Sequence, residues 1–162
     1  MKFLVHPHRS ALSRARPPVR LFLGFSAVLL LAMAAQRGVD GELTPAGVFE
    51  HYLGSGDSTE VMPLTALVES LHTTAFVYGF LWLMLGSLLV VSPVNERLRQ
   101  VLIFGGAAAC AFDLAAPLLV VWSRGAGLGL VRVASFALAW GLLFTSVVVL
   151  LRTFGRADPE PS

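Results

Sequence analysis

Four ionisable side chains lie within or beside long apolar segments of the chain: Glu69, His72, Asp113 and Arg132. Charged groups are costly inside a membrane, so those found there commonly form ion pairs, move protons or bind ligands. A helical rise of about 1.5 Å per residue places His72, Asp113 and Arg132 in one layer of the outer half of a bilayer. Glu69 lies three residues before His72 and would share its helix face. We expect one intramembrane polar cluster, contributed by three helices.

Three interpretations of this cluster are open. In the first, the cluster is structural: Asp113 pairs with Arg132, and His72 bonds to Glu69 or Thr73. In the second, it belongs to a small redox protein and holds a quinone or haem b, the haem with His72 and His51 as axial ligands and Arg132 on a propionate. In the third, Asp113 lies on a proton or solute pathway.

The sequence lacks the sets of residues that metal centres and common catalytic sites need. The Glu-x-x-His spacing of Glu69 and His72 occurs in di-iron bundles, but those need a second such pair and two further glutamates. A single cysteine, Cys110, forms neither a disulfide framework nor a thiolate zinc site. No nucleophile is spaced with a base, and no glycine-rich phosphate loop follows a strand. We therefore expect no metal site and no catalytic residues, and a non-enzymatic role is favoured.

The elements that must position these residues are hydrophobic helices. Of the 162 residues, 56% are hydrophobic and 14% charged, whereas soluble domains carry about 25% charged residues. This composition excludes a soluble enzyme or a nucleic-acid-binding domain. Residues 64–91, 101–122 and 130–151 are long enough to span a bilayer, and residues 21–35 form a shorter apolar stretch. In lipid, backbone N–H and C=O groups find hydrogen-bond partners only when the chain forms helices or a closed barrel. We predict an all-α membrane protein, a four-transmembrane-helix bundle.

The segment between the first two spans, residues 36–63, contains one further helix signal. Thr44 is a typical N-cap and Pro45 a typical first helical residue. A short amphipathic helix is predicted from residue 45 to 53, ending at Gly54. Its apolar patch suits a helix that lies on the membrane or caps the bundle, and comprises Val48, Phe49, Tyr52 and Leu53.

The basic residues predict the orientation. Most of the 12 Lys and Arg residues fall in residues 1–20, 92–100 and 152–162, whereas residues 36–63 carry mainly acidic charge. The positive-inside rule places both termini in the cytoplasm, with a basic arm at residues 1–20 and a tail at 152–162. We expect a bacterial inner (plasma) membrane protein whose basic arm contacts anionic lipid.

The first span has a second interpretation. A basic stretch, the apolar run and Ala32-Met33-Ala34 together match a secretory signal with its cleavage site. The apolar run continues through Ala35 without a polar break. A retained helix is therefore favoured over a cleaved signal peptide.

Small residues and a proline shape the second and third spans. Gly79 and Gly86 share one helix face, and residues 105–111 are mainly Gly and Ala. Such residues allow close helix packing, either within the bundle or against a membrane-protein partner or a second copy. Pro117 is expected to kink the third span and to free a carbonyl near Asp113.

Two short motifs carry a family resemblance: residues 50–54, Glu-His-Tyr-Leu-Gly, and residues 67–74, Leu-Val-Glu-Ser-Leu-His-Thr-Thr. They resemble a group of uncharacterised four-span bacterial inner-membrane proteins with Tyr-Tyr-x-Gly and then Leu-Leu-Glu-x-x-His-x-His. Here His51 replaces the first Tyr and Thr74 the second His. The resemblance implies a fold and location but no activity. The function expected is an accessory or structural subunit of a larger membrane complex; the alternatives are the redox protein and the proton or solute pathway.

Overall fold

The computed structural model describes residues 9–54, 61–125 and 127–155, and every regular element within them is helical. The elements are α1 (Arg9–Val39), α2 (Pro45–Leu53), α3 (Leu64–Val91), α4 (Glu96–Gln100), the π-helical turn η1 (Val101–Gly105), α5 (Gly106–Ser123) and α6 (Leu128–Gly155).

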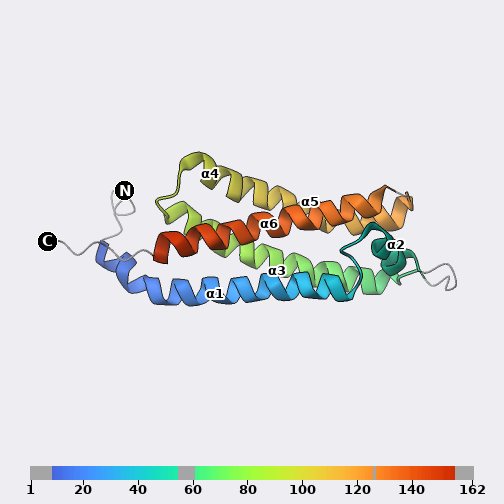
Figure 1. Cartoon of the computed structure of the whole chain (residues 1–162), viewed down its shortest axis with the longest axis horizontal. Helices are drawn as coiled ribbons and strands as arrows, with labels where there is room; N and C mark the ends of the chain where they lie inside the picture. The colour runs from blue at the N-terminus through green and yellow to red at the C-terminus, as the bar shows by residue number, and fades with distance from the viewer. Residues whose placement is uncertain (1–8, 55–60, 126, 156–162) are drawn as a thin grey trace.

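The long helices run side by side along one axis, with α2 across one end of the bundle (Figure 1). We call this the α2 end, and the opposite end, which holds α4, the α4 end. Within the described residues, four helical stretches are long and apolar enough to cross a membrane: Arg16–Val39, Leu64–Val91, Glu96–Ser123 and Leu128–Phe154. The all-α fold of four membrane-spanning helices is therefore confirmed, and the chain is a multi-pass membrane protein.

The first helix begins earlier than the apolar pattern of residues 21–35 indicates. It starts at Arg9, inside the segment that we predicted as a basic arm, and continues to Val39. Pro17 and Pro18 lie within it, and its first turns are set at an angle to the rest (Figure 1). Proline removes a backbone donor and bends a helix without ending it. Hydropathy finds the lipid-facing part of a helix and misses its polar ends. Residues 1–8 of the predicted arm and 156–162 of the predicted tail lie outside the described residues.

Helix α6 is the centre of the packing, because it contacts α1, α2, α3 and α5. Helices α5 and α6 are antiparallel neighbours, joined by a short turn in which Arg124 is left-handed with φ 50°. The main core is apolar, and its fully buried members include Leu23, Leu30, Leu81, Leu85, Ala139, Val147 and Leu150.

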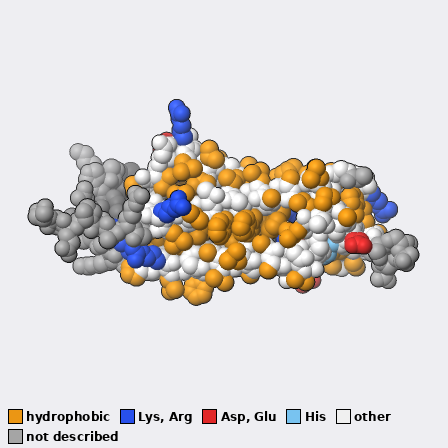
Figure 2. Space-filling view, in the orientation of Figure 1, with side chains coloured by type: hydrophobic (Ala, Val, Ile, Leu, Met, Phe, Trp, Pro, Cys, Tyr) orange, Lys and Arg blue, Asp and Glu red, His pale blue; other side chains and the backbone are white. Residues whose placement is uncertain are grey.

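The outside of the bundle is also apolar. Large hydrophobic side chains are exposed on every spanning helix, among them Phe25, Phe76, Phe104 and Leu138. Figure 2 shows hydrophobic side chains along the length of the bundle and charged side chains gathered toward its two ends. A soluble protein does not expose so much apolar surface, so this surface faces lipid.

Helix α2 caps the bundle. The Gly47 N–H donates to Thr44 Oγ1 over 3.1 Å, which confirms the predicted N-cap, and the helix ends at Gly54 with φ 83°. Val48 and Tyr52 are buried against α5 and α6. At Gly129 of α6, a Cβ would stand 2.6 Å from the Pro45 carbonyl oxygen. Glycine is therefore required there for α2 to dock this closely.

Candidate functional site: a buried polar network at the α2 end

The network is centred on an ion pair between two spanning helices. Asp113 of α5 and Arg132 of α6 are each 1% exposed, and Arg132 Nη1 contacts Asp113 Oδ1. The same Nη1 donates to the Asp113 backbone oxygen over 3.1 Å. The sequence predicts an ion pair between these two residues, and the structure brings them into direct contact.

Pro117 explains the second of these bonds. Because proline has no N–H, the carbonyl four residues earlier in the helix, that of Asp113, lacks its helical donor. The Arg132 guanidinium takes the place of that donor. One arginine thus satisfies both the side chain and the backbone oxygen of Asp113.

The second carboxylate of the network comes from the loop between α1 and α2. Glu42 is 5% exposed and accepts from Arg132 Nη2 over 2.9 Å and from the Tyr52 hydroxyl over 3.0 Å. It also forms an ion pair with Arg37, near the end of α1. Glu42 therefore connects α1, the capping helix α2 and the centre of the bundle.

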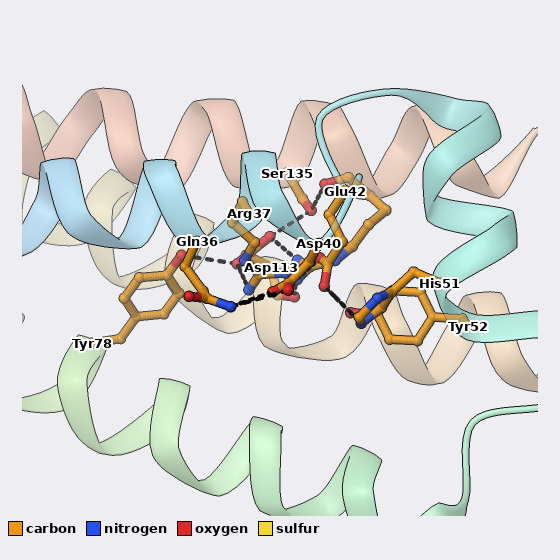
Figure 3. A network of polar contacts seen from close by, with 10 residues as sticks. Gln36, Arg37, Asp40, Glu42, His51, Tyr52, Tyr78, Asp113 and Ser135 are labelled. Carbon is orange, nitrogen blue, oxygen red and sulfur yellow. Dashed lines mark hydrogen bonds and ion pairs between the residues drawn. The ribbon is translucent and has the colours of Figure 1, made fainter.

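Further donors surround Asp113. The Tyr78 hydroxyl of α3 donates to Asp113 Oδ2 over 2.9 Å, and Ser135 Oγ of α6 donates to Oδ1 over 2.9 Å. Arg37 Nη2 lies 3.8 Å from Oδ2. Figure 3 shows these side chains converging from different helices on one point. Each of α1, α3, α5 and α6 contributes at least one side chain.

The charges within this network balance. Arg37 and Arg132 face Glu42 and Asp113, so the formal charges of the four sum to zero. A buried charge without a partner would be very costly, and mutual pairing removes most of that cost. Burial, together with the negative charge of Glu42, raises the pKa of the Tyr52 phenol, so this hydroxyl stays a donor. Arg132 Nε is buried without a partner among the described residues.

The comparisons with known proteins agree with this architecture. A family model described as a transmembrane helical domain matches residues 42–160. The chain belongs to this family. The match begins at Glu42 and includes α2, α3, α5 and α6, which carry Tyr52, Tyr78, Asp113, Arg132 and Ser135. It does not include Arg37, because α1 lies before it. No curated protein and no solved structure matches the chain.

The other residues singled out from the sequence occupy different places. His51 of α2 lies at the edge of the network, with Nε2 3.4 Å from Glu42 Oε1 and its ring edge-on to Tyr52. Glu69 and His72 are exposed on α3, where they line a hollow with Leu64, Thr65 and Val68. The structure thus brings Asp113, Arg132 and His51 to one end of the bundle but gives Glu69 and His72 an outward face.

Sequence reasoning did not assign Arg37, Glu42, Tyr52, Tyr78 or Ser135 to the cluster. Arg37 and Glu42 read as ordinary charges of an outer segment, and Tyr52 as part of an apolar patch. One signal was available for Glu42 and Arg37, which lie in or beside a short loop that leads into the capping helix. Such a loop places its charged side chains over the end of the bundle. For Tyr78 and Ser135 the sequence contains no such signal, because a single hydroxyl in an apolar helix is common.

The chemistry open to the network follows from its contacts. Arg132 Nη1 already donates to Asp113, and Nη2 already donates to Glu42. The Arg132 side chain is buried inside the bundle. A haem propionate could reach Arg132 Nη1 or Nη2 only by displacing one of these carboxylates. Within the part of the chain that is described, no three His, Cys, Asp or Glu residues form a group that could hold a metal ion. The geometry favours a structural polar network that fixes the α2 end.

Proposed function

We propose that this membrane protein is an accessory subunit of a larger membrane complex, and that it docks a helix of a partner protein between α3 and α5. The observation that carries the proposal is an apolar groove of about 200 Å³ on the outside of the bundle. We call it the α3–α5 groove; it is lined by Ala75, Tyr78, Gly79 and Trp82 of α3 and by Ala107, Cys110, Ala111 and Leu114 of α5.

The glycines of α3 support a partner in this groove. A Cβ added at Gly79 would meet nothing within 4 Å, and the same holds for Gly86, two turns along the same face. These glycines therefore do not serve close packing inside the bundle, although glycine lowers helix propensity by about 1 kcal/mol. In membranes, faces of small residues allow another helix backbone to approach closely. A partner helix would make use of the open space.

The shape of the groove favours a different protein over a second copy. In a two-fold dimer centred on this groove, the groove of one copy would lie against the groove of the other, so only side chains from the rim could enter it. A single helix from another membrane protein presents a convex surface and fills the groove. We therefore commit to a partner helix as the occupant.

The structure offers less support for a proton or solute pathway through Asp113. On the α4 side of the network the core is apolar, and Leu85, Leu89 and Leu150 fill it. The buried serines on that side, Ser26, Ser92 and Ser146, each donate to a carbonyl of their own helix. Among the described residues, the buried side chains on the α4 side of Asp113 include no Asp, Glu, His or Lys that could relay a proton.

The test is site-specific photocrosslinking in the native membrane. A photoreactive amino acid is placed at Ala75 on one wall of the groove or at Ala111 on the other. Both positions should yield the same discrete crosslinked membrane protein. Gly79→Leu should abolish that product because its side chain fills the groove, while thermal stability in detergent stays equal or rises, because leucine has the higher helix propensity.

Gly24→Leu is the matched control. Gly24 of α1 is exposed and also has nothing within 4 Å of an added Cβ, so the same substitution there should leave the crosslinked product intact. Crosslinking to lipid alone, or to a second copy of this chain, would contradict the proposal. A product that survives Gly79→Leu would also contradict it.

The orientation belongs to this proposal as well. We infer from the basic residues that the α4 end faces the cytoplasm of a bacterium and the α2 end the outside of its inner membrane. A topology reporter fused after Ser162, and one inserted at Glu96 in α4, should both report a cytoplasmic position. An external signal from either reporter would reverse the assignment.

A further inference from the structure

A second cavity opens on another side of the bundle, between α1 and α3 at the α2 end. Its volume is about 430 Å³. Helix α1 packs chiefly on α6, and α3 packs on α5 and α6. The rings of Phe22 and Phe80 connect α1 to α3, 6.3 Å apart. We call this cavity the α1–α3 cleft; its walls are Met33, Gln36, Arg37, Asp40 and Glu42 on one side and Ala66, Glu69, Ser70, Thr73, Thr74 and Val77 on the other.

The character of the cleft changes with depth along both helices. The lining residues farthest from the α2 end are Met33 on α1 and Val77 on α3, both apolar. Closer to the α2 end the lining turns polar, with Gln36 and Asp40 facing Thr73 and Glu69. An occupant that matches both parts is amphiphilic, with its polar head toward the membrane surface and its chain toward the membrane interior.

The charge of the residues that line the cleft indicates which headgroup it can bind. Arg37 and Glu42 form an ion pair within a network whose charges sum to zero. Among the described residues, the Asp40 carboxylate accepts only from the Gln36 side-chain amide, over 3.0 and 3.1 Å, and Glu69 is exposed. In the described residues neither Asp40 nor Glu69 belongs to an ion pair. Their two carboxylates leave the cleft with an excess of negative charge, which attracts a headgroup with a cationic end.

We propose that the α1–α3 cleft binds a phospholipid whose headgroup ends in a primary ammonium, such as phosphatidylethanolamine. A primary ammonium has three donors and no acceptor, so it suits two carboxylates. The first methylene groups of an acyl chain would lie along Met33 and Val77. The apolar floor favours a lipid over a soluble amine. The cleft also opens sideways between two spanning helices, near the level of the lipid headgroups, and this opening likewise favours a lipid.

The test measures which lipid the purified protein retains. The protein in detergent is equilibrated with equal amounts of phosphatidylethanolamine, phosphatidylcholine and phosphatidylglycerol of identical chains, and native mass spectrometry counts the bound lipids. We expect phosphatidylethanolamine first, phosphatidylcholine second, because its cation lacks N–H donors, and phosphatidylglycerol last. Glu69→Gln or Asp40→Asn should lower the preference for phosphatidylethanolamine over phosphatidylglycerol by about tenfold, the loss of one charge-assisted hydrogen bond.

Glu50→Gln provides the matched control, because Glu50 is an exposed carboxylate at the same end of the bundle that does not line the cleft. It should leave the preference unchanged. Equal retention of the three lipids, or an equal effect of Glu50→Gln and Glu69→Gln, would overturn the proposal. Displacement of bound phosphatidylethanolamine by free ethanolamine at similar concentration would keep the ammonium site but overturn the lipid as its occupant.

Discussion

The two ends of the bundle are held together by different forces. At the α2 end, Arg37, Glu42, Asp113 and Arg132 form directional ion pairs between α1, α5, α6 and a loop. At the α4 end the buried residues are mainly aliphatic, and α1 is tied to α6 by Arg20, which donates to the Phe154 carbonyl over 2.8 and 3.0 Å.

This difference shows how helices find their partners in lipid. An aliphatic helix face packs almost as well against acyl chains as against another helix, because the hydrophobic effect is absent between them. A carboxylate and a guanidinium in the same surroundings have few acceptable partners. The polar end therefore specifies which helices are neighbours, and the apolar end adds close packing to an arrangement already specified.

The largest effect is expected from breaking the central pair. Arg132→Leu leaves Asp113 and Glu42 with one fewer cation, and removing one partner of a buried pair costs about 3–5 kcal/mol. Adding Asp113→Asn restores charge balance, because Arg37 and Glu42 remain paired. The double variant should therefore regain much of the loss. Denaturation in mixed detergent measures both; a double variant no more stable than Arg132→Leu would show that the pair contributes no coupling.

A loss of stability caused by a substitution at the α4 end should behave differently from one caused at the central ion pair. Leu150 is 0% exposed, and Leu150→Ala should cost about 2–5 kcal/mol through lost packing. No second substitution at the α2 end should compensate for it, since distant sites add independently. Combining Leu150→Ala with Arg132→Leu tests this. Losses that fail to add would show that the two ends are coupled and are not stabilised independently.

The sequence predicts the helices better than the polar contacts between them. Residues 64–91 matched α3 (Leu64–Val91) at both limits, and the Thr44 cap with Gly54 bounded α2, because hydropathy and capping are local properties. The contact of Asp113 with Arg132 could be anticipated from a short connection between antiparallel helices. The contact of Glu42 with Arg132 joins residues 90 positions apart. A charged loop beside a capping helix places Glu42 over the bundle but does not indicate which residue it meets.

The same limit explains the outward face of Glu69 and His72. Depth in the membrane can be counted along each helix, but the direction of a side chain depends on how the helix is rotated against its neighbours. That rotation is determined by contacts such as the one between Tyr78 and Asp113. A helix whose sequence is only weakly amphipathic contains little information about its rotation against its neighbours.

A smaller loss should follow from removing one neutral donor of the network. Tyr78→Phe leaves Asp113 with Arg132, Ser135 and Arg37 as partners, so we expect a cost of about 1.5 kcal/mol, that of one hydrogen bond to a charged group. Tyr52→Phe at Glu42 should cost a similar amount and, in addition, increase cleavage by protease near α2. Unchanged stability in both variants would show that the carboxylates do not depend on the phenols.

The smallest effect is expected outside the network, where an indole donates to a neutral carbonyl. Trp82 Nε1 of α3 donates to the Ile103 carbonyl in the π-helical turn over 2.8 Å, and Trp140 Nε1 of α6 donates to the Leu30 carbonyl over 2.8 Å. Hydrogen bonds between membrane helices are worth about 0.6 kcal/mol on average, so Trp82→Phe and Trp140→Phe should each cost about 1 kcal/mol, including the lost ring contacts. Because neither bond involves a charge, each loss should be independent of ionic strength and should add to that of Tyr78→Phe. A Trp82→Phe loss as large as that of Arg132→Leu would place the specifying contact at η1 and remove the distinction between the two ends.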